Sequence, residues 1–347
     1  MTAKEATMSK ANLDWSNLVF GYYKTDQNIR YIWRDGAWDG GVLSPDETFP
    51  LHIAATCLHY GQECFEGLKA YETKKGDVVV FRVEENARRM IRSCRKILME
   101  PPPEDMFIEA VFRVINANRR FVPPYGTGAS LYIRPLTFGI GPQIGVRPAG
   151  EYMFLILVTP VGPYFKTGFK PVDMLIEEEV DRAAPLGVGD VKVGGNYAAS
   201  LRAGVAAKKK GYADVIYLDA KEKRYLDESG PANFFAIKNG QYITPASHTI
   251  LPSITNMSLV TLAEEMGLRP QRRPVLVDEI FDFTEAGCCG TAAVITPIGS
   301  LTWRDRKAVY SKDGKPGKHC LELYQRLMAI QVGDAPDPYG WVHLVPE

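Results

Sequence analysis

A chain of 347 residues has room for one large domain or two of ordinary size, and at this length about 75% of the unfolded surface becomes buried. Hydrophobic residues make up 46% of the chain and charged residues 24%, which is typical of a globular protein. The formal net charge is zero, and no apolar run reaches the roughly 18 residues of a membrane-spanning helix. We therefore expect neither a nucleic-acid partner nor a membrane partner.

The six cysteines follow no zinc-ligand spacing, and the adjacent pair Cys288 and Cys289 is too close for an ordinary disulfide. The first residues resemble neither a signal peptide nor a transit peptide. We expect reduced thiols, no bound metal and a cytoplasmic location. Residues 1–17 are mostly small and polar, and are expected to form a flexible arm.

The first part of the chain, residues 18–165, has the pattern of a small α+β domain. Tyr31–Trp33 and Ala37–Trp38 flank a glycine-containing turn, and Leu68–Glu72 and Val78–Arg82 flank another. Both pairs are predicted hairpins.

Two helices and two strands are expected to follow these hairpins. Apolar residues recur at helical spacing from Val83 to Leu98, until a run of prolines stops the pattern. A second helix is expected at Glu104–Phe121, and central strands at Ala129–Phe138 and Tyr152–Val161. This arrangement predicts helices packed on an antiparallel sheet.

Residues 166–180 are expected to hold an interdomain linker, and residues 181–347 a larger, strand-rich domain with peripheral helices. The expected strands are Val172–Glu177, Val215–Asp219, Asn233–Lys238, Gln241–Thr244 and Gly287–Ile295. The expected helices are Asn196–Lys210, Asn256–Met266, Val277–Phe283 and Gly317–Ile330.

Lys192 stands out because it lies between a stretch of small apolar residues and the pair Gly194-Gly195, just before a predicted helix. A lysine in a partly buried place loses hydration, which lowers its pKa and makes its amine available as a nucleophile. Such an amine can form a Schiff base with a carbonyl compound. An exposed loop lysine is the alternative interpretation.

With its surroundings, this lysine resembles the cofactor-binding lysine of the branched-chain amino acid aminotransferases, which use pyridoxal 5'-phosphate. The resemblance extends from about Phe20 to Ile330. The other motifs that support it occur in the expected order: Tyr60 to Lys69, Tyr132 to Leu136, Val161 to Phe165, Leu226 to Gly230, Asn233 to Phe235, and Gly290 to Ala293. It implies the two-domain fold type IV of pyridoxal-phosphate enzymes, with a smaller N-terminal α/β sandwich and a larger C-terminal pseudo-barrel.

The resemblance assigns three residues to the reactive part of the cofactor. Lys192 is the catalytic lysine, and Tyr197 is the donor to the phenolic oxygen. Glu228 is the anion that keeps the pyridine nitrogen protonated, with its neighbour Asp227 as the alternative. Without the resemblance, a tyrosine on a helix is more often a core residue, and a solvated turn residue is the favoured interpretation of either acid.

The resemblance also implies a phosphate cradle. Ile254 and Thr255 open a predicted helix, whose N-terminus presents unpaired N–H groups to an anion. Gly290 and Thr291 are expected to form a second part of the cradle, and Arg89 a charged contact, although Arg88 and Arg92 lie nearby.

Two departures from the family pattern fall in the cradle. Ser253 replaces the usual glycine and Asn256 replaces a common arginine, and we expect both to tune the cradle without abolishing it. The redox-sensitive Cys-x-x-Cys of some members is absent here, because Ala293 and Thr296 occupy its positions.

The substrate site implied by the resemblance is an apolar pocket with a polar edge. Its expected residues are Tyr60, Phe65, Gly67, Tyr132, Arg134, Tyr164, Thr291 and Ala292. Arg134 lies among apolar residues of a predicted strand, so either a structural ion pair or a substrate carboxylate is expected to partner it.

Together these features predict a homodimeric enzyme that transfers the amino group of leucine, isoleucine or valine to 2-oxoglutarate. The alternatives are another enzyme of this fold, such as a D-amino-acid transaminase or an aminodeoxychorismate lyase, and a non-catalytic pyridoxal-phosphate-binding protein. The sequence does not rank the three amino acids, because one methylene changes binding by only about 1–3 kcal/mol. Nor does it distinguish synthesis from breakdown.

Overall fold

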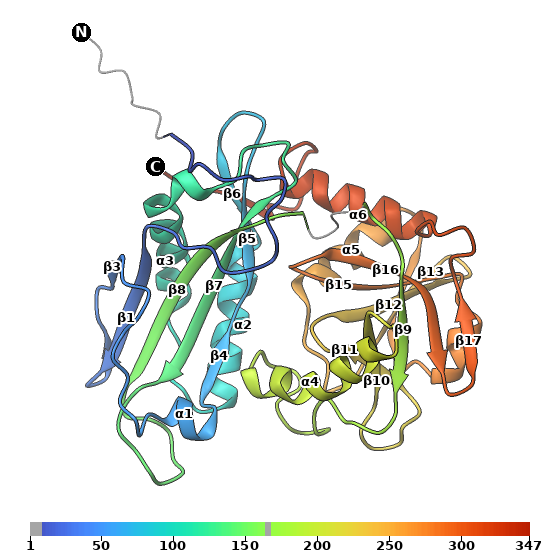
Figure 1. Cartoon of the computed structure of the whole chain (residues 1–347), viewed down its shortest axis with the longest axis horizontal. Coiled ribbons are helices and arrows are strands. Elements are labelled where there is room, and N and C mark those ends of the chain that lie inside the picture. Colours follow the sequence, from blue (N-terminus) through green and yellow to red (C-terminus); the bar gives the residue numbers. More distant parts are fainter. Residues whose placement is uncertain (1–8, 164–167) are drawn as a thin grey trace. The chain divides into compact units, whose positions relative to one another are not determined.

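The computed structural model describes residues 9–163 and 168–347, which divide into two compact units. The first unit contains the described chain up to residue 163 together with residues 330–347, and the second contains residues 168–329. Each unit is built around one nine-stranded sheet (Figure 1). Among the described residues no helix has both the length and the hydropathy needed to cross a membrane.

The sheet of the first unit is antiparallel throughout, with the strand order β18-β6-β5-β7-β8-β1-β2, while β3 pairs with β1 and β4 with β7. The strands are β1 (Asn28–Arg34), β2 (Ala37–Trp38), β3 (Val42–Ser44), β4 (Glu63–Phe65), β5 (Leu68–Glu72), β6 (Val78–Phe81), β7 (Ser130–Gly139), β8 (Tyr152–Val161) and β18 (Val342–Leu344).

Two helices, α2 (Val83–Lys96) and α3 (Glu104–Ala117), pack on one face of this sheet. Because side chains alternate along a strand, every second residue of β7 faces these helices. Thr137, for example, contacts Met90 of α2. Tyr132 and Arg134 therefore share the opposite face. The short helix α1 (Thr56–Tyr60) and the 3₁₀ helix η1 (Arg119–Phe121) complete this unit.

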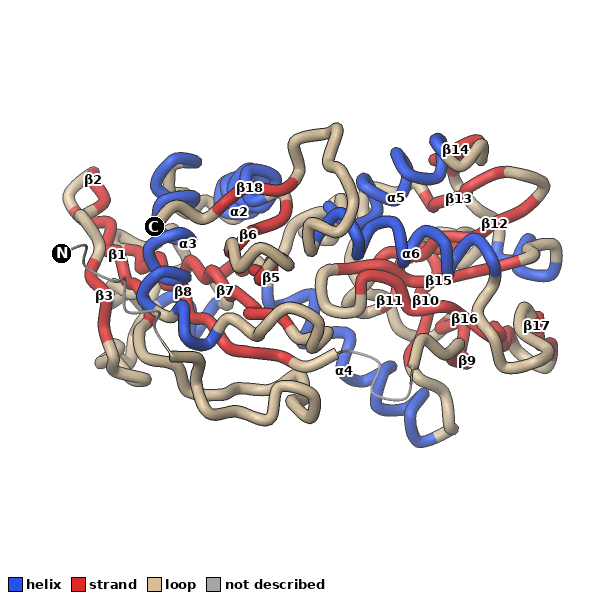
Figure 2. The backbone as a smooth tube through the Cα atoms, turned by 90° about the horizontal axis from the view of Figure 1, so that it is seen from above, coloured by secondary structure: helices blue, strands red, loops and turns tan. Residues whose placement is uncertain are grey.

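The sheet of the second unit is mixed, with the order β11-β10-β9-β16-β15-β12-β13-β14, and β17 pairs with β16. The strands are β9 (Val172–Glu177), β10 (Asp214–Leu218), β11 (Leu226–Ser229), β12 (Asn233–Lys238), β13 (Gln241–Pro245), β14 (Arg269–Arg273), β15 (Glu285–Gly290), β16 (Val294–Trp303) and β17 (Arg306–Val309). The helices are α4 (Gly194–Lys209), α5 (Ile254–Glu265), the 3₁₀ helix η2 (Val277–Phe281) and α6 (Lys318–Gln331) (Figure 2). The end of α6, from Ile330, already belongs to the first unit.

This second sheet curls until its two edges approach each other. The segment that follows β14 bridges the beginning of β11, where Leu226 donates its backbone N–H to the carbonyl of Val275 at 2.8 Å, and Tyr225 pairs with Leu276. An apolar core fills the curl, with the rings of Phe234 and Phe283 among its members. The sheet is therefore barrel-like.

Most of the predicted elements are present, and the exceptions have physical reasons. The expected strand Gly287–Ile295 is wrong as one element, because the chain turns at 291–293 between β15 and β16. The expected helix Val277–Phe283 is a 3₁₀ helix that ends at Phe281. In α4, Leu201 and Val205 are exposed, and it is the alanines Ala203 and Ala207 that face the core.

Residues 330–347 also differ from the expectation. The sequence pattern predicts that residues 181–347 all belong to the second domain. In the structure, β18 pairs with β6, so the C-terminal segment belongs to the first unit.

Candidate functional site

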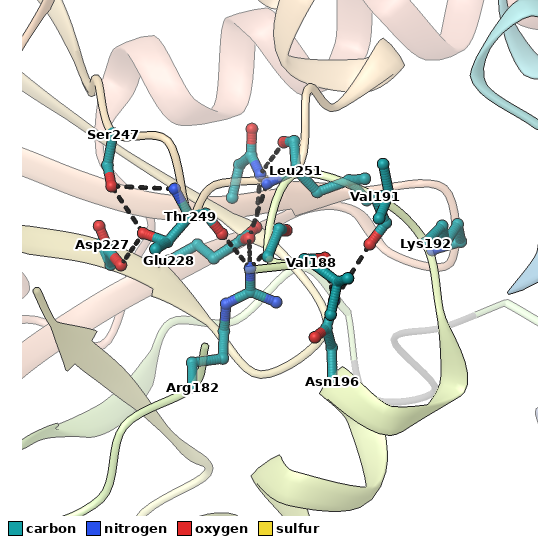
Figure 3. Close-up of polar contacts among 12 residues, drawn as sticks. Arg182, Val188, Val191, Lys192, Asn196, Asp227, Glu228, Ser247, Thr249 and Leu251 are labelled. Carbon is teal, nitrogen blue, oxygen red and sulfur yellow. Dashed lines mark hydrogen bonds and ion pairs between the residues drawn. The ribbon is translucent and has the colours of Figure 1, made fainter. Parts of the chain in front are cut away.

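The second unit holds Lys192 directly before helix α4, between the buried side chains of Val191 and Val193. The turn that leads to it is braced by Asn196, whose side-chain amide donates to the carbonyls of Val188 at 2.7 Å and Val191 at 3.1 Å (Figure 3). A side chain from the first turn of α4 thus fixes the backbone that presents the lysine.

The structure brings together Lys192 and Tyr197, two of the predicted cofactor residues. The Nζ atom of Lys192 donates a hydrogen bond to the hydroxyl oxygen of Tyr197 at 2.7 Å and lies 5.0 Å from the centre of its ring. Their separation of five residues across the start of a helix produces this contact. The amine and the phenol can therefore exchange a proton or hold a common ligand.

Glu228 on β11 is a buried carboxylate with three polar partners. The backbone N–H of Leu251 donates to Oε1 at 2.9 Å, the amide of Asn233 donates to Oε2 at 2.7 Å, and Nη2 of Arg182 lies 2.6 Å from Oε1. Burial raises the pKa of Glu228 to about 7, while the charge of Arg182 acts in the opposite direction. This carboxyl group is therefore poised to titrate near neutral pH.

The neighbouring acid, Asp227, points toward a different set of groups, because successive residues of a strand alternate in direction. Its Oδ2 atom accepts a hydrogen bond from the hydroxyl of Thr249, which is itself 2.6 Å from the hydroxyl of Ser247. Burial raises the pKa of Asp227 as well. Of the two acids, Glu228 is the one that binds Asn233 and the backbone just before α5.

The N-terminus of α5 has the form expected of an anion-binding site. Ser253 is the N-cap, and its hydroxyl accepts a hydrogen bond from the backbone N–H of Asn256 at 3.2 Å. Ile254 and Thr255 are buried in the first turn, and no hydrogen bond of the described residues uses their backbone N–H groups. The departure at Ser253 thus caps the helix and leaves two donors for a ligand.

Gly290, Thr291 and Ala292 lie at the hairpin between β15 and β16. Gly290 pairs with Val294 across a turn of three residues. Val294 has a φ of 63°, a left-handed conformation that is unfavourable for a β-branched residue. Strain of this kind costs on the order of 1–3 kcal/mol and often occurs at functional sites.

In the first unit, Phe65, Tyr132 and Arg134 form one cluster. Nη2 of Arg134 donates to the hydroxyl of Tyr132 at 2.9 Å, and the guanidinium carbon lies 4.7 Å from the centre of the Phe65 ring and 5.2 Å from that of Tyr132. Gly67 makes room for the tyrosine, since a Cβ there would lie 2.2 Å from the Tyr132 hydroxyl. Four of the predicted substrate residues are therefore adjacent.

The contacts of Arg134 bear on the two partners expected from the sequence, which are a structural ion pair and a substrate carboxylate. No carboxylate of the described residues pairs with it, and its buried Nε has no hydrogen-bond partner among them. A buried guanidinium N–H without an acceptor is costly. An incoming carboxylate would satisfy it.

Arg89, the predicted phosphate contact, is a buried residue of α2 that forms a two-bond pair with Glu66. Its Nε and Nη2 atoms each lie 2.7 Å from one carboxylate oxygen of Glu66. Asn86 donates to the same carboxylate at 2.7 Å. The guanidinium is therefore held rigidly, and its role toward a phosphate stays a prediction.

Of the other predicted substrate residues, Thr291 and Ala292 belong to the hairpin between β15 and β16, and Tyr60 is not part of this cluster. Tyr60 ends α1, and its hydroxyl donates to the backbone carbonyl of Ile144. Tyr164 lies outside the described residues.

The sequence predicts no role for Arg182, Asn233 or Lys69, and for Asn256 only an adjustment of the phosphate cradle. Arg182 and Asn233 contact Glu228, and Asn256 contacts Asn233 in turn. Lys69 lies opposite Tyr132 in the sheet, and desolvation lowers its pKa to about 8. An arginine directly before the small apolar run at 183–188 was the one signal available for Arg182.

The chemistry of these donors fits a phosphate-bearing pyridine aldehyde. The second unit offers an amine for the aldehyde at Lys192, a buried carboxyl for a ring nitrogen at Glu228, and two unpaired N–H groups at the start of α5 for a phosphate. Among the described residues no cluster of histidine, cysteine or acidic side chains is placed to hold a metal.

Comparison with known proteins agrees with this chemistry. Residues 63–301 match the family model described as amino-transferase class IV. A curated branched-chain-amino-acid aminotransferase of Haemophilus influenzae is 46% identical over 95% of this chain and 98% of its own length. The solved Escherichia coli branched-chain amino acid aminotransferase is 29% identical, with a TM-score of 0.76 over 93% of this chain and all of its own.

A second solved structure, the branched-chain amino acid aminotransferase of Thermobaculum terrenum in its pyridoxal-phosphate form, is 25% identical, with a TM-score of 0.75 over 94% of this chain and all of its own. The fold is therefore that of a class IV aminotransferase. Within that class, the chain belongs to the branched-chain-amino-acid aminotransferase family. The expected fold type IV is confirmed.

Proposed function

We propose that this protein transfers amino groups between branched-chain L-amino acids (leucine, isoleucine and valine) and 2-oxoglutarate, with pyridoxal 5'-phosphate as its cofactor. The products are branched-chain 2-oxo acids and glutamate. The observation that carries the proposal is the 2.7 Å contact between the amine of Lys192 and the hydroxyl of Tyr197 at the start of α4. The relatives named for this activity, which match nearly the whole chain, support it.

Several of the residues described above would hold the cofactor. The backbone N–H groups of Ile254 and Thr255 would bind the phosphate at a helix N-terminus, and the turn at Gly290 and Thr291 would add further contacts. Arg89 of the first unit would provide a charge, held in place by Glu66. When bound, pyridoxal phosphate supplies the electron sink that stabilises a carbanion at the substrate Cα.

Lys192 has two tasks in this proposal. Its amine would bind the aldehyde of the cofactor, and it would carry the proton at the substrate Cα. Tyr197 accepts a hydrogen bond from the amine and so fixes its direction. Glu228 would accept a hydrogen bond from the ring nitrogen and keep that nitrogen protonated.

The first unit would supply the substrate contacts. The ring of Phe65 and the ring of Tyr132 offer apolar surface to an aliphatic side chain, while the unpaired Nε of Arg134 suits the second carboxylate of glutamate. The main chain of Thr291 and Ala292 would bind the α-carboxylate. Tyr60 and Tyr164 remain proposed wall residues.

The direct test measures glutamate formed from each of L-leucine, L-isoleucine and L-valine with 2-oxoglutarate, with D-alanine as the contrasting donor. Borohydride reduction followed by peptide mapping should label Lys192. The variant Lys192→Ala should lose turnover, whereas Lys209→Ala, on the last turn of the same helix, should keep it. Free turnover by Lys192→Ala, or labelling of another side chain, would refute the proposal.

We also propose that the second unit is the cofactor-binding domain, and that the protein works as a homodimer in the cytoplasm on small molecules, without a nucleic-acid or membrane partner. Sedimentation of the pure protein tests the dimer. A monomer that remains fully active at nanomolar concentration would contradict it.

A further inference from the structure

Arg182 is a buried arginine that the proposed chemistry does not use. It lies between β9 and α4, and only about 6% of its surface is exposed. Burial of a guanidinium is costly unless its charge is paired and its N–H groups find acceptors. Its contacts therefore indicate what the fold gains from it.

One nitrogen of Arg182 contacts three separate segments of the second unit. Nη2 donates to the carbonyl of Gly189 at 2.8 Å and to the carbonyl of Thr249, and it lies 2.6 Å from the carboxylate of Glu228. In Figure 3 its guanidinium points toward Glu228 and the backbone that continues to Leu251. The three contacts join β11, the turn before Lys192 and the loop before α5.

Each of those segments ends at a group proposed to bind the cofactor. The turn that contains Gly189 leads to Lys192 three residues later in the chain. The loop that contains Thr249 leads to Leu251, which binds Glu228, and then to the first turn of α5. A shift of Arg182 would therefore disturb several of these groups together.

We propose that Arg182 is a positioning residue of the cofactor site, which favours the ionised form of Glu228 and fixes this carboxylate relative to the backbone that presents Lys192. This inference rests on the proposed function for the role of Glu228. The contacts themselves belong to this chain and can be tested without cofactor.

The other groups around Glu228 do not supply a positive charge. Asp227 is a second acid, and its nearness works against ionisation of Glu228. Asn233 and Leu251 contribute neutral N–H donors. The thiols of Cys288 and Cys289 on β15 are buried and stay protonated, because desolvation and the nearby carboxylate raise their pKa. Arg182 is thus the cation that opposes the desolvation of Glu228.

The test uses the full-length protein with ¹³C-labelled glutamate side chains, stripped of cofactor and titrated by NMR. Arg182→Met removes the charge at similar volume, and we expect the pKa of Glu228 to rise above its value in the unaltered protein. Arg182→Lys keeps the charge and should recover most of the difference. Asn196→Ala is the matched control, because it loosens the same turn from α4 without contacting Glu228.

Binding of pyridoxal phosphate to the stripped protein provides a second readout. At pH 6, below the pKa of Glu228 in either protein, we expect Arg182→Met to bind about tenfold more weakly than the unaltered protein, the effect of a one-unit rise in that pKa. If the unaltered protein binds no pyridoxal phosphate, the proposed function fails, while the NMR titration still decides the role of Arg182.

Three results would overturn the inference. One is a folded Arg182→Met protein with an unchanged Glu228 titration, and another is an equal change in Asn196→Ala. Should Arg182→Met not fold, Arg182→Gln is titrated in its place. If both neutral variants fail to fold while Arg182→Lys folds, Arg182 serves the fold alone and the inference is wrong.

Discussion

Replacement of Asn256 should reveal a buried hydrogen-bond chain that ends at Glu228. The side-chain amide of Asn256 donates to Oδ1 of Asn233 at 3.2 Å and to the hydroxyl of Thr244 at 2.8 Å, while its oxygen accepts from the hydroxyl of Tyr242 at 2.8 Å. Asn233 in turn donates to Glu228 at 2.7 Å. Asn256 therefore sets the orientation of the amide that binds the carboxylate.

The magnitude follows from the groups that Asn256→Ala leaves without partners. Thr244 keeps its own hydrogen bond to the carbonyl of Phe234, but the hydroxyl of Tyr242 and Oδ1 of Asn233 each lose a partner in the interior. Each stranded group costs about 1–3 kcal/mol. After a gain of about 0.5 kcal/mol in helix propensity, we expect a net loss of about 3 kcal/mol in the free energy of unfolding.

A double-mutant cycle of Asn256→Ala and Tyr242→Phe separates loss of their hydrogen bond from simple loss of packing. Tyr242→Phe alone should cost about 1 kcal/mol, because it leaves one oxygen of Asn256 without a donor. In the Asn256→Ala background the same change should be neutral or stabilising, since it removes a buried hydroxyl that has already lost its hydrogen-bond partner.

The assay is urea unfolding of the cofactor-free protein, followed by circular dichroism and extrapolated to water. Thr261→Ala on the same helix is the control and should change stability by less than about 0.5 kcal/mol. Strictly additive effects of the two substitutions would show that the chain from Tyr242 to Asn256 does not exist, and would refute the reasoning.

Three further predictions concern the other buried polar groups. Glu66→Ala should cost about 3–5 kcal/mol in urea unfolding, because it removes the carboxylate that pairs with the buried Arg89; a loss below about 1 kcal/mol would contradict the pairing. Gly67→Ala would place a Cβ 2.2 Å from the Tyr132 hydroxyl, and steady-state kinetics should show kcat/KM for leucine lowered by about 100-fold; unchanged kinetics would show that the tyrosine moves freely. The pKa of Glu228 is raised by burial to about 7, so its proton is held more tightly in the folded state than in the unfolded one. The cofactor-free protein should therefore lose stability as the pH rises from about 4.5 to about 7, and Glu228→Gln, compared in urea at pH 5 and pH 8, should remove that part of the slope.

The residues that could be predicted from the sequence are those whose partners lie nearby in the chain. Lys192 and Tyr197 are five residues apart across a predicted helix start, and their side chains are in contact in the structure. Arg182 could not be assigned in this way, because its partners belong to β11 and to the loop after β13. Contacts that depend on strand order cannot be read from local patterns.

The missed hairpin between β15 and β16 has a different cause. A turn is usually recognised by glycine, asparagine or aspartate, whereas this one contains Thr-Ala-Ala and a valine with positive φ. The continuous apolar run therefore predicted one strand where the chain forms two. The positive φ of Val294 also departs from what a β-branched residue adopts readily, so no local pattern signals the turn.

The pairing of β18 with β6 makes the first unit discontinuous in the chain, with the whole second unit inserted into it. During translation, the apolar edge of Val78–Phe81 emerges long before Val342–Leu344 can cover it. An uncovered strand edge invites pairing with other chains. Nascent chains must therefore be protected from aggregation until the ribosome has released this last strand, and a purification tag fused beside it risks exposing the same edge in the finished protein.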